Sequence, residues 1–211
     1  MSVGTANGEL GQIVRIGIVV GSTRPGRRAR VVAEWAGFIA SEREAAVFEI
    51  VDLDDYDLPL LDEPVPAAMG GYRQPHTKRW SEVIDRFDGY VFVTPEYNHS
   101  FPGALKNAID FLYSEWQNKA AGLLTYGLSG GIRAGEQLRL VLAELKVASV
   151  RSHVALTLRD DFDLTDDGAL NPSPQQVRLF ERMLDEIVEW AAALRTVRIG
   201  NTPPDTNTEE R

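Results

Sequence analysis

Residues 21–28, with the sequence GSTRPGRR, combine the residue types that bind a phosphate group. Gly21 and Gly26 allow tight backbone turns, and the amides that follow a strand here face the start of a helix. Four arginines fall within seven residues, at positions 24, 27, 28 and 30. Because the arginine fork matches the oxygens of a phosphate, this segment predicts an anion site. A plain strand-to-helix turn with a solvated basic face is the alternative.

Two well-known nucleotide-binding loops do not fit this segment. The spacing of Gly21 and Gly26 matches the triphosphate-binding P-loop, but arginines occupy the positions of its lysine and its metal-binding hydroxyl. The dinucleotide pattern G-x-G-x-x-G does not occur here. These departures argue against triphosphate chemistry and against a dinucleotide bound in the Rossmann manner.

A second segment, residues 95–100, places a proline, a carboxylate, an aromatic ring, an amide and an imidazole directly after an apolar run. Exposed backbone and an aromatic surface suit a planar heterocycle that needs hydrogen bonds along its edge. The alternative is a loop whose polar groups only cap the next helix. Glu96 is the one carboxylate here, which gives no support to the paired carboxylates of a glycosidase. With histidines only at 76, 99 and 153, we expect no metal site, and we interpret His99 as a hydrogen-bonded structural residue.

A third segment, residues 127–133, has the sequence GLSGGIR. Gly130 and Gly131 permit close approach of the backbone to a ligand, although a tight strand-to-helix turn needs the same residues. This segment alone is a weak indication of binding. Its weight comes from its position relative to the other two.

Five apolar runs alternate with amphipathic segments, which is typical of a parallel sheet with helices on both faces. We expect strands over residues 13–20, 47–53, 90–94, 121–126 and 154–158. Helices are expected within 31–39, 80–87, 105–112, 138–145 and 177–191, where apolar residues recur at helical spacing. In such an α/β three-layer sandwich, ligands bind beyond the carboxyl ends of the strands. The three segments follow strands one, three and four, so they should meet at one edge.

The composition places limits on the class of protein. The chain has 211 residues and a formal net charge of −9, which favours one domain and argues against a general nucleic-acid binder. It has no cysteine, which excludes thiolate catalysis and suits a reducing compartment, so we expect a cytoplasmic protein. No apolar run approaches the ~18 residues of a membrane helix. We expect a folded domain over residues 13–200, a flexible leader over 1–12 and a disordered tail over 201–211.

The motifs GSTRPGR, TPEYNHSFPGALKNAID and YGLSGGIRAG, in this order, resemble those of the NAD(P)H-dependent FMN reductase family. The resemblance covers about residues 14–197, and PEYN with its flanks is the most specific part. It implies a flavodoxin-like fold with strand order 2-1-3-4-5 and a bound FMN. The residues that it assigns to the cofactor are Ser22, Arg24, Gly26, Arg27, Pro95, Glu96, Tyr97, Asn98, Ser129, Gly130 and Gly131. Many relatives have Ser and Asn where Arg27 and Ala29 stand here, so a charge replaces two hydrogen-bonding groups.

The resemblance also implies an enzyme that passes reducing equivalents from NADPH or NADH to a flavin, quinone, azo compound or metal oxyanion. The flavin would carry the chemistry, so we expect no side chain to act as a catalytic acid, base or nucleophile. FMN is expected in preference to FAD because one phosphate loop is present and no diphosphate pattern. Because the three segments meet at one edge of the sheet, NAD(P)H and the electron acceptor would bind there in turn, which predicts a ping-pong mechanism. A flavin-binding redox sensor with little turnover is the alternative.

A homodimer or homotetramer is implied by the same resemblance. The apolar residues Phe101, Phe111, Leu112, Tyr113 and Trp116 are more than one helix face can bury, which is compatible with a subunit interface. Ordinary core is the alternative for these residues. Neither nucleic acid nor a membrane is expected as a partner.

Overall fold

The computed structural model describes residues 13–163 and 169–200, so the predicted leader and tail lie outside it. The strands of the main sheet are β1 (Val14–Val20), β2 (Ala46–Asp52), β3 (Gly89–Pro95), β4 (Ala120–Gly127) and β5 (Ala148–Thr157). They pair in parallel in the order β2-β1-β3-β4-β5, which confirms the predicted flavodoxin-like topology. The strand order therefore reverses between β1 and β3, the place where ligands bind in sheets of this kind.

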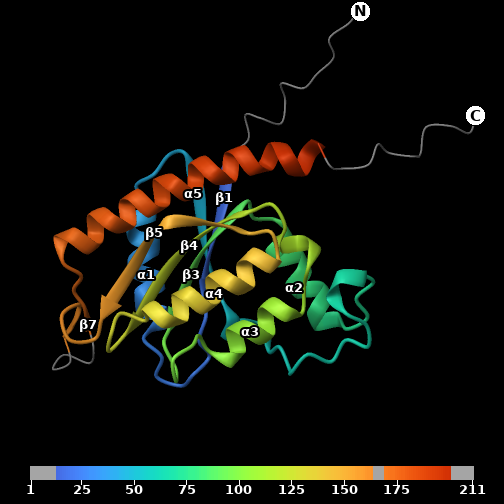
Figure 1. Ribbon diagram of the computed structural model, residues 1–211, viewed down its shortest axis with the longest axis horizontal. Helices are drawn as coiled ribbons and strands as arrows, with labels where there is room; N and C mark the ends of the chain where they lie inside the picture. Colours follow the sequence, from blue (N-terminus) through green and yellow to red (C-terminus); the bar gives the residue numbers. More distant parts are fainter. Residues whose placement is uncertain (1–12, 164–168, 201–211) are drawn as a thin grey trace, which may run out of the picture.

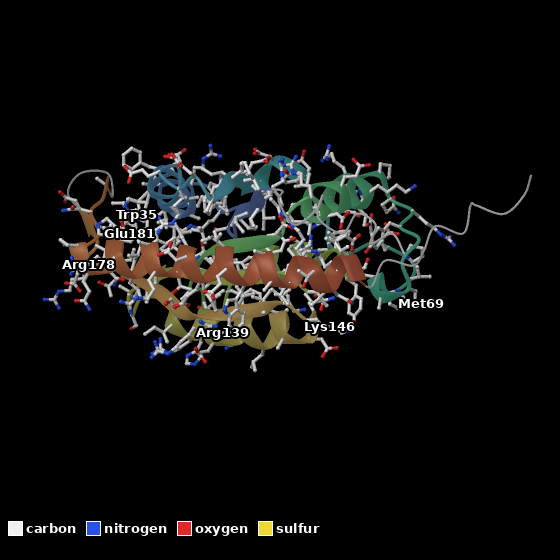
Figure 2. All side chains as sticks on the ribbon, turned by 90° about the horizontal axis from the view of Figure 1, so that it is seen from above. Trp35, Met69, Arg139, Lys146, Arg178 and Glu181 are labelled. Carbon is white, nitrogen blue, oxygen red and sulfur yellow. The ribbon has the colours of Figure 1, made fainter. Side chains whose placement is uncertain are left out.

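Helices cover both faces of the sheet (Figure 1). They are α1 (Ala29–Ala40), α2 (Pro75–Asp85), α3 (Gly103–Asp110), α4 (Ile132–Glu144) and α5 (Pro174–Gly200). On one face α1 and α5 lie side by side, and the rings of Trp35 and Phe180 are 5.0 Å apart between centroids (Figure 2). The other three helices pack against the opposite face. No helix among the described residues is both long and apolar enough to cross a membrane.

Short elements complete the chain. The 3-10 helices are η1 (Leu53–Tyr56), η2 (Ala67–Met69) and η3 (Ser114–Trp116), and a small hairpin pairs β6 (Phe162–Asp163) with β7 (Ala169–Leu170). Between η1 and α2 the chain forms a long irregular connection that contains η2. It ends at α2, where Glu63 accepts backbone hydrogen bonds from Arg73 and Gln74 at the helix start. A carboxylate there satisfies amides that have no partner within the helix.

Several element boundaries differ from the sequence prediction, and α2 and α4 begin five and six residues before their predicted starts at 80 and 138. β5 begins at Ala148 and not at 154, because this edge strand alternates between buried and exposed residues and lacks a continuous apolar run. α3 ends at Asp110, although the apolar pattern extends to Leu112. α5 extends to Gly200, well beyond the predicted end at 191.

The expectation that Phe111, Leu112 and Trp116 belong to a subunit interface is wrong. All three are at most 1% exposed and lie in the core between the sheet and the helices α2, α3 and α4. The turn after α3 directs them inward, so a single helix face does not have to accommodate them. Phe101 and Tyr113 are only partly buried.

Candidate functional site

The three segments singled out in the sequence meet at one edge of the sheet, beyond the carboxyl ends of β1, β3 and β4 (Figure 1). A pocket of about 220 Å³ opens between them. Its lining residues are Arg24, Arg27, Arg28, Pro95, Glu96, Tyr97, Tyr126, Gly127, Leu128 and Leu158. The pocket therefore has a basic side from the first loop and an aromatic and apolar side from the strand ends.

The first loop begins after β1 at Gly21, where close packing favours a residue without a side chain. The amide of Gly21 donates to the carbonyl of Val93 at 2.8 Å, and a Cβ on Gly21 would lie 2.9 Å from Leu105. Ser22 follows and is fully buried. Its Oγ lies 3.0 Å from the phenol oxygen of Tyr97, so a hydrogen bond joins the first loop to the second.

The arginines of the first loop differ in their partners. The guanidinium of Arg27 contacts the carboxylates of Asp52 at 2.9 Å and Asp54 at 3.1 Å. The side chain of Asp52 is 2% exposed, so this pair holds the loop against the end of β2. Arg30 contacts Glu34 and Asp52. Carboxylates of the chain therefore balance the charges of Arg27 and Arg30.

Arg24 and Arg28 have no carboxylate partner among the described residues. The guanidinium of Arg28 lies 5.5 Å from the ring centroid of Phe162, and its Nη1 is buried without a hydrogen-bond partner. Arg24 is exposed, with its guanidinium 5.8 Å from the ring centroid of Tyr97. A buried donor without an acceptor carries a desolvation cost that an anion would remove. The pocket thus offers two unpaired positive charges.

The second loop is a tight turn fixed at both sides. Tyr97 and Ser100 exchange backbone hydrogen bonds of 2.8 and 3.1 Å, and Asn98 and His99 between them have φ values of 49° and 74°. Two left-handed residues in succession define a type I′ turn, which Asn tolerates well. Gln137 of α4 donates to the carbonyl of His99 at 2.8 Å and accepts from the hydroxyl of Ser100 at 2.5 Å. Gln137 thus ties the backbone of the turn to α4, and the predicted structural role of the His99 imidazole, whose residue is exposed, stays a prediction.

Glu96 serves the start of α4. Its carboxylate accepts from the backbone amide of Arg133 at 3.1 Å and from the guanidinium of the same residue at 2.8 Å. Burial alone would raise the pKa of the Glu96 carboxyl, but the hydrogen bonds from Arg133 outweigh it and hold that pKa below its usual value. The carboxylate is therefore charged at neutral pH and engaged within the chain. The backbone amide of Glu96 donates to the carbonyl of Tyr126 at 3.1 Å.

The third loop crosses from β4 to α4 in a turn of two left-handed glycines. Gly130 and Gly131 have φ values of 74° and 69°. A Cβ on Gly131 would lie 2.9 Å from the backbone N and O of Tyr126. Only glycine fits there, since both the backbone conformation and the space exclude a side chain. Ser129 beside them is exposed.

The sequence prediction assigned half of the residues that line this pocket. Five of the assigned residues line it, namely Arg24, Arg27, Pro95, Glu96 and Tyr97. Ser22 contacts one of them, and the remaining assigned residues (Gly26, Asn98, Ser129, Gly130 and Gly131) lie in the three adjoining loops. The lining residues that were not assigned are Arg28, Tyr126, Gly127, Leu128 and Leu158, although Arg28 belongs to the basic cluster noted in the sequence. Tyr126 could have been found as the neighbour of Pro95 across the parallel ladder.

The donor set of the pocket fits a phosphate monoester such as that of FMN. Such a group carries close to two negative charges and accepts several hydrogen bonds. The unpartnered Nη1 of Arg28 and the exposed guanidinium of Arg24 match it in charge. At ~30 Å³ for each water molecule, the pocket holds several waters and so has room for a phosphate.

A sheet of this order with an anion pocket at its topological switch point defines a flavodoxin-like ligand-binding protein. The model of the NADPH-dependent FMN reductase family matches residues 14–160, and the chain belongs to this family. The predicted class of enzyme, an NAD(P)H-dependent flavin oxidoreductase, is thereby confirmed.

Individual relatives agree with this assignment. The chain is 40% identical to an NAD(P)H-dependent FMN reductase of Schizosaccharomyces pombe over 70% of its length and 74% of the relative's. It is 31% identical to a quinone reductase of Pseudomonas putida over 89% of its length and the whole of the relative's. Among solved structures, the flavoenzyme FerB from Paracoccus denitrificans, an NAD(P)H:(acceptor) oxidoreductase, aligns with a TM-score of 0.63 at 22% identity. The alignment covers 86% of this chain and 98% of that one, which supports the fold.

Proposed function

We propose that the pocket binds FMN through its phosphate and that the protein transfers reducing equivalents from NADPH or NADH to a small acceptor. The proposal rests on two arginines without a carboxylate partner that line a pocket at the topological switch point. Arg24 and Arg28 would contact the phosphate. Arg27, which is held by its ion pairs with Asp52 and Asp54, would fix the loop that carries them. Ser22 would contribute a buried hydroxyl.

The remaining assigned residues would orient the ring of the cofactor. Bound FMN would supply the redox chemistry by accepting a hydride and returning electrons to an acceptor. Pro95, Glu96, Tyr97 and Asn98 would border the ring on one side, with Ser129, Gly130 and Gly131 on another. Because Glu96 is engaged with Arg133, its contribution would come from its backbone, and none of these side chains is needed as an acid or base.

Quinones, free flavins and azo compounds are the proposed acceptors. One relative is named a quinone reductase and another an FMN-dependent NADPH-azoreductase, and the family resemblance adds metal oxyanions to the proposed acceptors. The pocket lies at a single edge, so the nicotinamide and the acceptor would have to use the same place beside Tyr97 in turn. The cytoplasmic location expected from the absence of cysteine stays a prediction.

Steady-state kinetics test this proposal. With FMN-loaded protein, NAD(P)H oxidation measured against a small quinone should give parallel double-reciprocal lines, because NAD(P)⁺ must leave before the quinone enters. Intersecting lines would contradict the proposal that the nicotinamide and the acceptor use the same binding place in turn. A protein that binds FMN but consumes NAD(P)H no faster than free FMN would contradict the enzymatic function itself.

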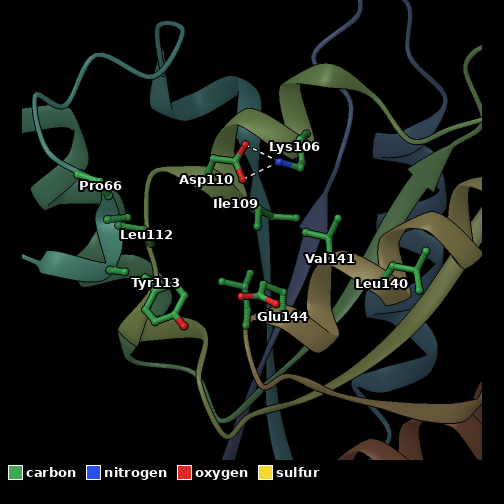
Figure 3. Close-up of a pocket in the computed structure, with 12 residues that line it drawn as sticks. Pro66, Lys106, Ile109, Asp110, Leu112, Tyr113, Leu140, Val141 and Glu144 are labelled. Carbon is green, nitrogen blue, oxygen red and sulfur yellow. Dashed lines mark hydrogen bonds and ion pairs between the residues drawn. The ribbon is translucent and has the colours of Figure 1, made fainter.

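A second copy of the chain is the proposed partner. An apolar groove of about 510 Å³ lies between α3 and α4 and is bordered by residues 66–68 (Figure 3). It shares Lys106, Leu140 and Val141 with a neighbouring cavity of about 520 Å³ that reaches Phe101 beside the second loop. Leu140 is 74% exposed on this surface. A continuous apolar groove that adjoins the candidate site supports a dimer or tetramer formed through this α3–α4 groove.

Leu140→Glu should therefore shift the protein toward a monomer. Light scattering of the wild type should give about two or four times the chain mass of 23.4 kDa, and the variant should give one chain at the same micromolar concentration. Phe38→Glu is the matched control, since Phe38 is 68% exposed on α1, away from the groove, and its change should leave the mass unaltered. A wild type of 23.4 kDa would contradict the oligomer.

A further inference from the structure

Thr125, in β4, lies directly beneath the glycine turn that follows this strand. It is fully buried, and its Oγ1 donates to the carbonyl of Gly130 at 2.6 Å. The Nε2 of His153, in β5, lies 2.9 Å from the same Oγ1. The hydroxyl has one hydrogen, which the Gly130 carbonyl takes, so Oγ1 must accept from a hydrogen on Nε2. A directed chain thus runs from His153 through Thr125 to the glycine turn.

The position of His153 is fixed by packing against α4. A Cβ on Gly135 would lie 2.5 Å from Cε1 of the His153 ring and 2.9 Å from its Nε2, so the helix backbone lies directly on the imidazole. Burial, helped by the charge of Arg139, lowers the pKa of His153 to about 4, while Glu136 opposes this shift. The ring is therefore neutral at pH 7, and its single N–H points at Thr125.

The hydrogen bond from Thr125 sets the orientation of the peptide between Gly130 and Gly131. In a trans peptide the C=O and the following N–H point in opposite directions. With the Gly130 carbonyl directed inward to Thr125, the N–H of Gly131 is directed away from the Thr125 hydroxyl. A Cβ on Gly127 would lie 3.4 Å from the nitrogen of Gly131 and 3.5 Å from Cβ of Glu96, which places this amide beside two residues that line the pocket.

We propose that Thr125 and His153 are positioning residues that keep the Gly130 carbonyl away from the cofactor ring and present the Gly131 amide to it. This inference rests on the proposed binding of FMN. A donor aimed at the ring favours the form that carries more negative charge, whereas a carbonyl turned outward would disfavour it. The hydrogen bonds from His153 through Thr125 to the glycine turn would thus strengthen the binding of reduced FMN relative to that of oxidised FMN.

Two matched pairs of variants test the proposal in the full-length protein. Thr125→Val removes the hydroxyl but keeps the branched shape, and Thr125→Ser keeps the hydroxyl. His153→Leu removes the N–H donor, and His153→Gln retains one. We expect Thr125→Val and His153→Leu to reduce the preference for reduced over oxidised FMN by about tenfold, which lowers the two-electron midpoint potential by about 30 mV. Thr125→Ser and His153→Gln should stay within about threefold of the wild type.

The readouts are the midpoint potential of the bound flavin, the dissociation constant of oxidised FMN and the thermal unfolding of the protein without flavin. If both variants of a pair lose stability equally and the potential stays at the wild-type value, the two residues only support the fold and the proposal is wrong. If Thr125→Val does not fold, the His153 pair decides by the same criteria. A wild type that fails to bind FMN would overturn the proposed function and this inference together. A wild type that binds FMN, with unchanged potentials in all four variants, would overturn this inference alone.

Discussion

Arg24→Ala and Arg28→Ala should each weaken the binding of FMN by roughly 10- to 150-fold. This range follows from a charge-assisted hydrogen bond of about 1.5–3 kcal/mol between a guanidinium and a phosphate oxygen. Both side chains line the pocket and neither is paired with a carboxylate of the described chain. Titration of the flavin-free variants with FMN, followed by fluorescence quenching, measures the effect.

Riboflavin, which has the same ring but no phosphate, is the control ligand for this prediction. Its binding should change less than threefold in both variants, because the lost contact is to the phosphate alone. Arg30→Ala is the control variant. It removes the same charge from the same region, but Arg30 is already paired with Glu34 and Asp52, so FMN binding should also change less than threefold. Equal losses for FMN and riboflavin, or a large loss in Arg30→Ala, would contradict direct phosphate contacts.

The adjacent arginines show where sequence reasoning reaches its limit in the first loop. The clustering of charges is visible in the sequence, and so is its place after a strand. Which arginine is paired with a carboxylate depends on the path of this loop before α1 and on the neighbouring strand. Arg27 is directed to Asp52 at the end of β2, and Arg28 to Phe162 in a hairpin more than a hundred residues away. Neither partner is evident from local spacing.

The meeting of the three loops at one edge was predictable for a simpler reason, whereas the strand order followed only from the family resemblance. Alternating apolar runs and helices restrict the chain to a parallel sheet, and all parallel strands end at the same edge. The role of Glu96 was not predictable in the same way. Its carboxylate caps α4, a helix that starts some 36 residues later, so the partner is set by the fold and not by the sequence around it.

The buried aromatic residues after α3 illustrate a related limit. Phe111, Leu112 and Trp116 belong to a group of five apolar residues, with Phe101 and Tyr113, that exceeds what one helix face can cover and is therefore compatible with an interface. The helix ends before them, and the turn that follows places them in the core. Hydrophobicity alone does not distinguish a subunit interface from the interior, because both bury the same residue types. The exposed fraction of each side chain, which only the structure gives, separates a surface residue such as Leu140 from the core.

Gly131→Ala should lower the free energy of unfolding by about 2–5 kcal/mol, much more than the same substitution at Gly26. Both glycines have a φ of 69°, so both substitutions incur the ~1–2 kcal/mol cost of a left-handed conformation in an L-residue. A Cβ on Gly26 meets nothing within 4 Å, whereas a Cβ on Gly131 lies 2.9 Å from the backbone N and O of Tyr126 and from Cβ of Thr125. These atoms belong to the central sheet and cannot move aside, which adds about 1–3 kcal/mol for overpacking.

The comparison of the two substitutions isolates the packing contribution. Replacing Gly by Ala restricts the unfolded chain in the same way at both positions, so this effect cancels in the difference. Urea unfolding of the flavin-free proteins measures both free energies under one set of conditions. If the two variants lose the same amount, the close approach of the third loop to β4 is not maintained in solution. In that case the fixed orientation of the Gly130–Gly131 peptide, on which the alignment of the Gly131 amide depends, would also be lost.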